Sequence, residues 1–337
     1  MRTTAVDCAK VISALCLFAL VSACGGGGGG SSGLSYSGST SPASLTSSNS
    51  TTLLSDAYAG GNTGTIIGQI GTAASLTTSN YDAPRRPRGL ALSETLVNFI
   101  RLSATADTAG TTSTAAAVNT IPTNTMNGNC GGSATLSGSY DDFSGAISIT
   151  ANFNAYCQDN STLSGSIAAA GNIVGSSSSG FSITNMGITI SNLSATMASG
   201  DSFTADGTLS IAPQSGYTSI STNSVITINM LLQDSTTSKI YKLSNYQISQ
   251  TVASSNNDIV ITGRYYDPDE GYIDLSTPTT IRIMSVDQWP SSGILKGTGN
   301  SSSATITALD NTSYQLDVDT DNNGTVDYTV TGLWNAL

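Results

Sequence analysis

Four aspartates and two asparagines lie within the C-terminal stretch "YQLDVDTDNNGTVDYTV". Asp319, Asp321 and Asn323, followed by Gly324, have the spacing of the first half of an EF-hand loop, in which alternate side-chain oxygens converge on Ca²⁺. The twelfth loop position holds Val330 instead of the bidentate glutamate, so the stretch is not an EF-hand. The calcium hypothesis gives five candidate ligands: Asp317, Asp319, Asp321, Asn323 and Asp327.

A β-hairpin explains the same stretch without a metal, because Asn323-Gly324 is a typical pair for a tight hairpin turn. One register pairs apolar residues with one another: Val318 with Val326, Leu316 with Tyr328 and Tyr314 with Val330. The same register places Asp317 opposite Asp327, which is unfavourable unless a cation or water screens the two charges. We favour the simple turn and keep the calcium turn as the alternative.

A second candidate site lies in "RYYDPDEGYID". It contains two sets of residues: the carboxylates Asp267, Asp269 and Glu270, and the tyrosines Tyr265, Tyr266 and Tyr272. The carboxylates could act as an acid and base pair or hold a cation, and the tyrosines could stack on a sugar. A turn that contains Pro268 and closes at Gly271 accounts for both sets without a function. We favour the turn.

The chain contains no histidine. This absence excludes Ser-His-Asp and Cys-His catalysis, histidine proton shuttles and most zinc or copper sites. Apart from Lys10, near the N-terminus, the lysines are Lys239, Lys242 and Lys296, and none lies in a Ser-x-x-Lys motif. We therefore expect that the protein is not an enzyme and has no cofactor, apart from Ca²⁺ if the C-terminal turn binds it.

Acidic residues outnumber basic residues by 22 to 11, and the formal net charge is −11. A surface of this sign argues against nucleic acid or anionic lipid as a partner. Only Glu94 and Glu270 are glutamates. Aspartate prefers turns, caps and cation sites to helix interiors, so we expect few long helices.

The segment from Cys130 to Cys157 reads as a hairpin whose two halves alternate apolar and polar residues. A turn over residues 141–144 pairs Leu136 with Ala151 and Ala134 with Phe153. The same register brings Cys130 opposite Cys157. We predict a disulfide between them, since closing a loop of this length stabilises a fold by roughly 3.5 kcal/mol in the chain-entropy model.

The first 23 residues place Arg2 and Lys10 before the apolar run "VISALCLFALVSA", which is the layout of a secretory signal peptide. The run is too short to cross a bilayer, which takes about 20 helical residues. Val21, Ser22 and Ala23, followed by Cys24, resemble the lipobox of bacterial lipoproteins. The resemblance implies cleavage before Cys24 and acylation of Cys24 with fatty chains such as palmitate. Gly25 after the cysteine, by the same resemblance, suggests the outer membrane.

We divide the chain into four parts. Residues 1–23 are the lipoprotein signal peptide, and the Gly/Ser/Thr-rich residues 24–80 are a disordered tether. Residues 81–129 are a connector with one short helix, near 93–104, for which Ser93 is the N-cap. Residues 130–337 form the β-rich domain.

The period-two alternation of apolar residues recurs from Cys130 to the end, separated by short Ser, Asn, Asp and Gly turns. This pattern predicts an all-β antiparallel meander. Glycines inside the strands, as in "VITGRYY" and "LKGTG", mark bends, bulges or close approach of another backbone. We expect a curved sheet, an incomplete barrel or a closed barrel, with the short helix against its concave side. A β-solenoid or two-sheet sandwich stays open as an alternative.

The last 80 residues or so contain "GYID", "PSSG" and "DTDNNGT". These segments resemble the signatures "YGYVD", "PSSG" and "DTDGDGT" of a family of uncharacterised bacterial lipoproteins, except that Asn323 replaces the usual aspartate. The family implies no known activity. We expect an exported, membrane-anchored protein with a binding or structural role in the cell envelope, facing either the periplasm or the surface. The alternative is a half-barrel carrier of a lipid or another apolar ligand.

Overall fold

The computed structural model describes residues 33–58 and 118–336, the latter with short gaps at 142, 159, 177–179, 197–199, 201 and 219–222. Its strands are β1 (Val118–Asn127), β2 (Gly131–Asp141), β3 (Ala146–Gln158), β4 (Ser161–Ser176), β5 (Gly180–Thr196), β6 (Ser202–Pro213), β7 (Asn223–Asp234), β8 (Ile240–Val252), β9 (Asn256–Asp267), β10 (Gly271–Met284), β11 (Ser292–Thr298), β12 (Ser303–Ala308), β13 (Ser313–Asp319) and β14 (Tyr328–Leu333). A helix spans residues 50–58, and a short 3-10 helix, η2 (Trp334–Ala336), follows β14.

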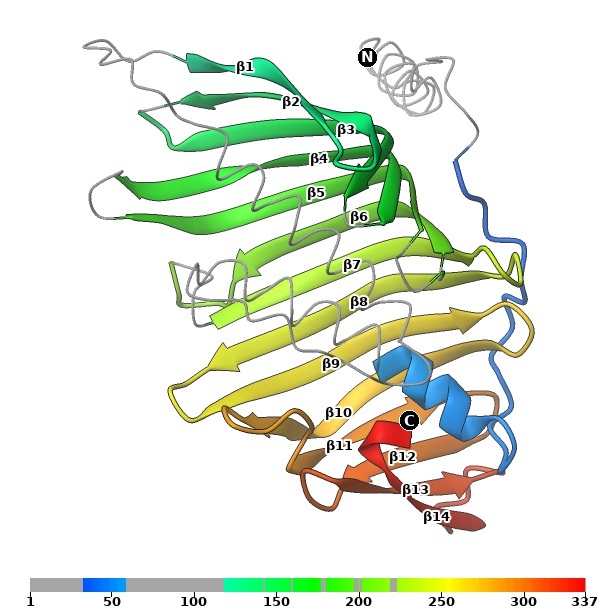
Figure 1. Cartoon of the computed structure of the whole chain (residues 1–337). Helices are drawn as coiled ribbons and strands as arrows, with labels where there is room; N and C mark the ends of the chain where they lie inside the picture. The colour runs from blue at the N-terminus through cyan, green and yellow to red at the C-terminus, as the bar shows by residue number, and fades with distance from the viewer. Residues whose placement is uncertain are drawn as a thin grey trace, which may run out of the picture. The chain divides into compact units, whose positions relative to one another are not determined.

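In the described part of the chain all 14 strands form one antiparallel sheet, in which each strand pairs with the next along the sequence (Figure 1). The predicted antiparallel meander is therefore confirmed. The sheet is not closed, because β1 and β14 are its two edges. Of the forms expected from the sequence, the structure shows an open, curved sheet with one short helix.

Alternating apolar residues give the sheet one buried face, which we call the inner face; the opposite face is the outer face. Ile188, Ile226, Ile261, Leu295 and Leu316 lie on the inner face, and none of them is more than 2% exposed. Burying a side chain of this size stabilises the folded state by about 1.5 to 3 kcal/mol relative to leaving it exposed. The pairing of Met230 with Leu243, and of Leu232 with Tyr241, follows this alternation.

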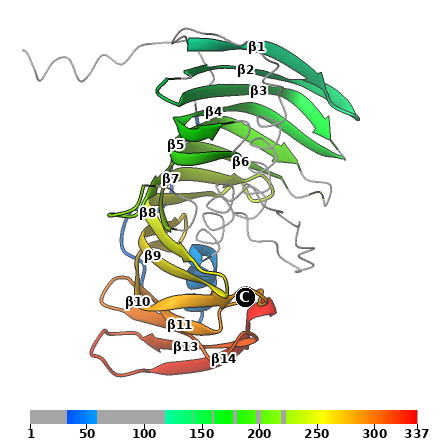
Figure 2. The same cartoon turned by 90° about the vertical axis from the view of Figure 1, so that its left-hand side faces the viewer.

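The sheet is curved (Figure 2), and its ladders contain bulges. The ladder between β8 and β9 shifts register between Ser244 and Gln247, where Asn245 has a φ of 47°. Gly263 of β9 lies against this bulge with a φ of 119°, and a Cβ there would be 2.4 Å from the carbonyl oxygen of Asn245. A bulge adds a residue to one strand and increases the local twist and bend. The prediction that strand glycines mark curvature is correct here.

The hairpin of β2 and β3 has the predicted register, with Leu136 opposite Ala151 and Ala134 opposite Phe153. A disulfide joins Cys130 to Cys157 with 5.1 Å between their Cα atoms, as predicted. The register shifts near the open end, so that Cys157 pairs with Gly131 and Cys130 lies one position outside the ladder.

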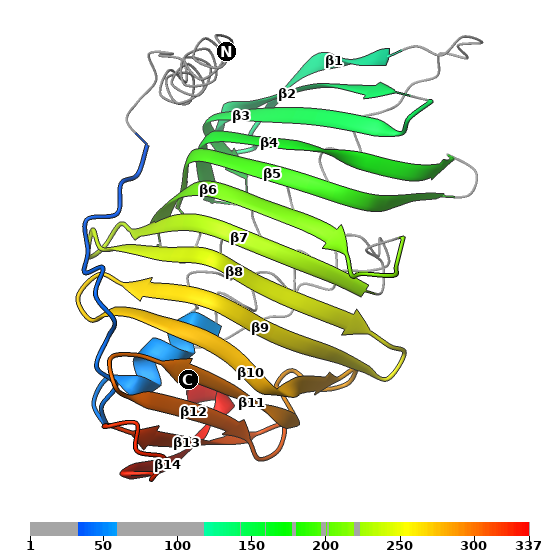
Figure 3. The ribbon, with the colours of Figure 1, turned by 180° about the vertical axis from the view of Figure 1, so that it is seen from behind.

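Residues 34–49 form an extended strap that runs past the ends of strands β6 to β10 (Figure 3). The amide of Leu34 donates to Asp206 of β6 at 3.2 Å. Farther along, the amide of Ser39 donates to the carbonyl of Pro268 at 2.9 Å, and Ala43 donates to Tyr272 of β10 at 2.8 Å. The predicted disordered tether over 24–80 is therefore wrong for residues 34–58.

Helix 50–58 packs on the inner face after the strap has passed the sheet end (Figure 1). A hydrogen-bonded turn precedes the helix: Asn49 Oδ1 accepts from the Thr46 amide at 2.9 Å, and the Thr46 hydroxyl accepts from the Ser48 amide at 3.3 Å. Leu53 and Leu54 are at most 1% exposed, and Leu54 lies against Gly297 of β11. A helix of this length is unstable alone, so packing on the sheet must stabilise it.

The sheet also begins earlier in the chain than the sequence predicts. Strand β1 begins at Val118, so the sheet starts 12 residues before the predicted domain boundary at Cys130. Residues 118–127 therefore belong to the sheet and not to the predicted connector. The predicted helix at 93–104 lies outside the described residues, as do residues 1–32.

Candidate functional site

The loop between β13 and β14 is organised by its own carboxylates. Asp319 ends β13 and is 8% exposed. Its two oxygens accept hydrogen bonds from the amides of Asn323 at 3.2 Å and Gly324 at 2.8 Å. Asp321 accepts from the same Asn323 amide at 3.1 Å and from its side-chain Nδ2 at 2.9 Å. The loop thus folds back around Asp319.

Asp327 closes the loop from the other side. Its Oδ2 accepts from the Thr320 hydroxyl at 2.6 Å and from the Thr320 amide at 2.8 Å. The hydroxyl first, and then the amide, lower the pKa of Asp327 below its ordinary value. Asp327 is therefore held as a carboxylate pointing at the start of the loop.

Three of the five predicted calcium ligands converge in this loop. One carboxylate oxygen from each of Asp319, Asp321 and Asp327 lies within 4.8 Å of the others. Ca²⁺ binds six to eight oxygens at 2.3 to 2.6 Å, so three oxygens at this separation can share one ion, with water as the remaining ligands. The arrangement fits a hard cation and offers no nitrogen or sulfur donor from these three residues.

The other two predicted ligands have different roles. Asp317 lies opposite Thr329 and accepts from its hydroxyl at 2.7 Å and from Gln315 Nε2 at 2.8 Å. The side-chain oxygen of Asn323 accepts from the Thr325 amide at 2.7 Å. The structure therefore removes Asp317 from the acidic cluster and uses Asn323 to hold the loop.

The predicted register of this hairpin is wrong by two residues. β13 and β14 pair Val318 with Tyr328 and Leu316 with Val330, and Asp317 does not face Asp327. The reason is the loop, which spans residues 320–327 and is much longer than a two-residue Asn-Gly turn. Its backbone amides are satisfied by carboxylates rather than by a tight turn.

The second candidate, around Asp267, is a structural turn between β9 and β10. Asp267 Oδ1 accepts from the amides of Asp269 at 2.9 Å and Glu270 at 3.1 Å. Asp269 forms an ion pair with Lys239, and Glu270 accepts from Asn49 Nδ2 at 2.8 Å. Each carboxylate is thus engaged with a different partner, which supports the favoured interpretation as a turn.

The tyrosines of this segment divide between the two faces of the sheet. Tyr265 points inward, is 4% exposed and stacks with Tyr241. Tyr266 and Tyr272 are paired on the outer face with ring centroids 5.4 Å apart. The three rings therefore cannot form the single sugar platform considered from the sequence.

Sequence reasoning missed the residues that complete the outer-face cluster. Tyr36 of the strap lies edge-on to Tyr266 at 5.5 Å, and the Lys242 ammonium lies 4.8 Å from the Tyr266 ring centroid. The Arg264 guanidinium lies 3.7 Å from the Tyr272 ring centroid and pairs with Asp274. Burial and the nearby Asp267 charge raise the pKa of Tyr36 to about 12. The one sequence feature that could have indicated this cluster is Tyr36, a tyrosine within a Ser/Gly-rich tract.

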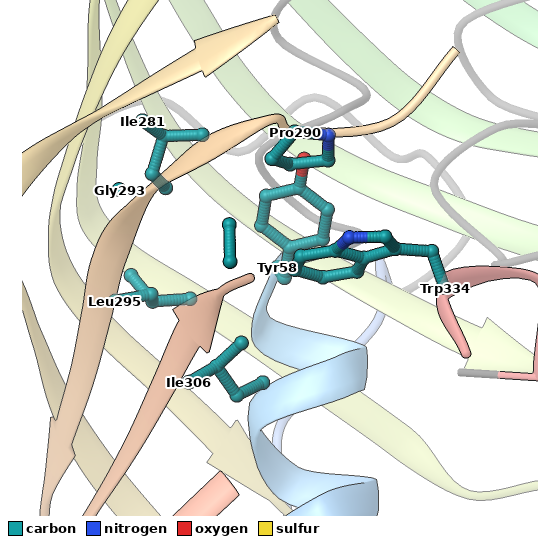
Figure 4. Close-up of a pocket in the computed structure, with 8 residues that line it drawn as sticks. Tyr58, Ile281, Pro290, Gly293, Leu295, Ile306 and Trp334 are labelled. Carbon is teal, nitrogen blue, oxygen red and sulfur yellow. The ribbon is translucent and has the colours of Figure 1, made fainter. Parts of the chain in front are cut away.

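A small apolar cavity lies where helix 50–58 meets the C-terminus (Figure 4). Tyr58 and Trp334 line one side of it, and Ile281, Leu295 and Ile306 line the other. Its volume is ≈ 10 Å³, which is about the space that one water molecule needs. This cavity is therefore too small for a lipid chain.

Comparisons with protein-family models, with curated proteins and with solved structures found no match to this chain. Within the described residues, no helix combines the length and the apolar composition needed to cross a bilayer.

Proposed function

We propose that this protein is a lipoprotein of the bacterial cell envelope, anchored through acylated Cys24, whose open sheet serves as a binding or structural body. The observation that carries the proposal is the Cys130–Cys157 disulfide. Disulfides persist in secreted and periplasmic proteins and are rare in the cytosol. Export is also what the charged-then-apolar N-terminus and the "VSAC" segment predict.

The strap limits how far an anchored body could move from the membrane. Leu34 follows Cys24 by ten residues, and ten residues span at most about 35 Å when fully extended. The sequence alone predicted a much longer tether, which was expected to reach residue 80. Because residues 34–58 pack on the sheet, the proposed tether is limited to the residues between Cys24 and Leu34.

The packing between helix 50–58 and strands β10 to β12 supports a binding or structural role over the alternative of a lipid carrier. A carrier needs an apolar cavity of a few hundred Å³. Among the described residues, Tyr58, Trp334 and aliphatic side chains instead reduce the cavity between helix 50–58 and strands β10 to β12 to ≈ 10 Å³. At this end of the described sheet, the packing supports a body that binds through its surface.

Acyl labelling tests the proposed anchor. We expect the chain to incorporate labelled palmitate when expressed with its N-terminal segment in a bacterial host. Cys24→Ser should abolish incorporation, whereas the matched Cys16→Ser should retain it. Labelling that survives Cys24→Ser, or a mature form that retains residues 1–23 by mass spectrometry, contradicts the proposal.

We also propose that the acidic loop binds Ca²⁺ and thereby stabilises the C-terminal hairpin. Millimolar Ca²⁺ should raise the melting temperature of the wild type, because a ligand that binds only the folded state stabilises it. Asp321→Asn should remove the increase. Asp317→Asn is the matched control, since Asp317 lies outside the cluster, and it should keep the increase. No calcium-dependent shift in the wild type refutes the site and leaves the lipid anchor untouched.

A further inference from the structure

Strand β14 is an open edge of the sheet. It pairs with β13 on one side, and no described segment pairs with its other side. An edge strand points half of its backbone N–H and C=O groups outward, where they can pair with another strand. The described chain therefore ends its sheet with a row of available backbone groups.

The two edges of the sheet differ in how they are protected. β1 contains Pro122, which lacks an N–H donor, and its ladder with β2 shifts register between Ile121 and Asn124. Proline and bulges are devices that block pairing at an edge. β14 has the sequence "YTVTGL", which contains no charge and no proline, and its register with β13 is regular throughout.

Apolar side chains remain exposed at β14. Tyr328, on the inner face, is 39% exposed, although its cross-strand neighbour Val318 is fully buried. Val326 just before the strand is 50% exposed, and Leu333 at its end is 55% exposed. An added strand would continue the inner face and cover Tyr328 and Val330.

We propose that β14 pairs with β14 of a second copy of this chain, antiparallel and about a two-fold axis. A register centred on Val330 keeps both inner faces on the same side, and it places Tyr328 beside Gly332 of the copy. β14 is uncharged, so the pairing sets no like charges against each other. Asp327 at its start is already engaged with Thr320. Pro122 and the bulge in β1 disfavour the head-to-tail alternative.

Cysteine cross-linking tests the pairing and its register. The full chain, with Cys8, Cys16 and Cys24 replaced by serine, leaves an introduced thiol as the only free one beside the Cys130–Cys157 disulfide. Val330→Cys should form a disulfide-linked dimer under mild oxidation, because directly paired residues have Cα atoms about 5 Å apart. Leu333→Cys is the control and should stay monomeric, since its two copies would lie roughly 20 Å apart. Equal cross-linking of both variants, or none in either, overturns the proposal.

Sedimentation of the chain with Cys8, Cys16 and Cys24 replaced by serine tests the pairing without an introduced cysteine. We expect a concentration-dependent dimer, and Thr331→Lys should weaken it at least tenfold by placing lysines near one another across the axis. Thr262→Lys, an exposed position on interior strand β9, is the control and should dimerise normally. A monomer at all concentrations, or a dimer that Thr331→Lys leaves unchanged, overturns the proposal.

Discussion

The two ends of the sheet are stabilised in different ways. At the β1 to β3 end, a disulfide connects Cys130, just before β2, to Cys157 of β3 across a sequence separation of 27 residues. At the β10 to β14 end, helix 50–58 and the strap pack against strands more than 200 residues later in the chain. One end depends on a local covalent link, and the other depends on long-range packing.

The packed end is centred on Trp334. Its ring lies 5.1 Å from Tyr314, 6.1 Å from Tyr58 and 6.3 Å from Trp289, measured between ring centroids. Its indole N–H donates to the carbonyl of Asp310 at 3.0 Å. Trp334 therefore joins the helix, the C-terminus and two inter-strand connections in one cluster.

Removing Trp334 should have the largest effect on stability. Trp334→Ala should lower the free energy of unfolding by about 4 kcal/mol, because it deletes a buried aromatic side chain and leaves a cavity. Hydrogen exchange should quicken in β12 to β14 and stay slow in β2 and β3. Leu333→Ala, at a neighbouring exposed residue, should change stability by less than about 0.5 kcal/mol. Equal loosening at both ends would show that the ends are not independent.

Removing the disulfide should affect the opposite end. The double variant Cys130→Ser, Cys157→Ser should lose roughly 3.5 kcal/mol in the chain-entropy model. We expect faster hydrogen exchange in β1 to β3, with the amides of β12 to β14 unchanged. A reductant should then have no further effect on the variant. Loss of protection around Trp334 instead would contradict the division into two ends.

The same contrast explains what the sequence could predict. The register of β2 with β3 was predictable because the turn is short and local: Asp141 accepts from the amides of Phe143 and Ser144, and Gly145 donates to the Asp141 carbonyl. The register predicted for β13 and β14 was wrong because a long loop, held by aspartate side chains, joins the two strands. Period-two alternation identifies strands, but it does not give the length of the loop between them.

The strap and helix 50–58 could not be predicted from local sequence. The segment "STTLLSDAY" is too short to form a stable helix alone. Its apolar residues are buried only because β10 to β12 supply the opposite surface. For the candidate site, the sequence identified Asp319, Asp321 and Asp327, which the structure brings together. The sequence also included Asp317, which the observed register pairs with Thr329 and so keeps apart from the other three aspartates.

A hydrogen bond at the C-terminal end of helix 50–58 provides a smaller test of long-range packing. The hydroxyl of Tyr246, a residue fully buried on β8, donates to the carbonyl of Ala57 at 2.7 Å. Tyr246→Phe should cost about 1 to 2 kcal/mol, since the buried carbonyl loses its donor. Tyr217→Phe, at a residue 53% exposed, is the control and should be neutral. Equal effects of the two substitutions would argue against a stabilising role for this bond.

The smallest effect should come from Asp310, in the turn between β12 and β13. Hydrogen bonds from the hydroxyl and amide of Thr312, and from Ser313, lower the pKa of Asp310 to about 2. An unfolded aspartate titrates near pH 3.9. The folded state therefore binds this proton less readily, so the stabilisation is complete above about pH 4 and is lost as the pH falls toward 2.

Asp310→Asn should consequently flatten the dependence of the unfolding free energy on pH between about 4 and 2. Between pH 6 and 8 the slope should match that of the wild type, because Asp310 is ionised in both the folded and unfolded states there. Denaturant titrations at each pH measure both slopes. Because the Asp310 carbonyl also accepts from Trp334, a change confined to the acidic slope would separate the side chain's role in the turn from the packing of the Trp334 cluster. An acidic slope identical to that of the wild type would show that these hydrogen bonds do not favour the ionised form.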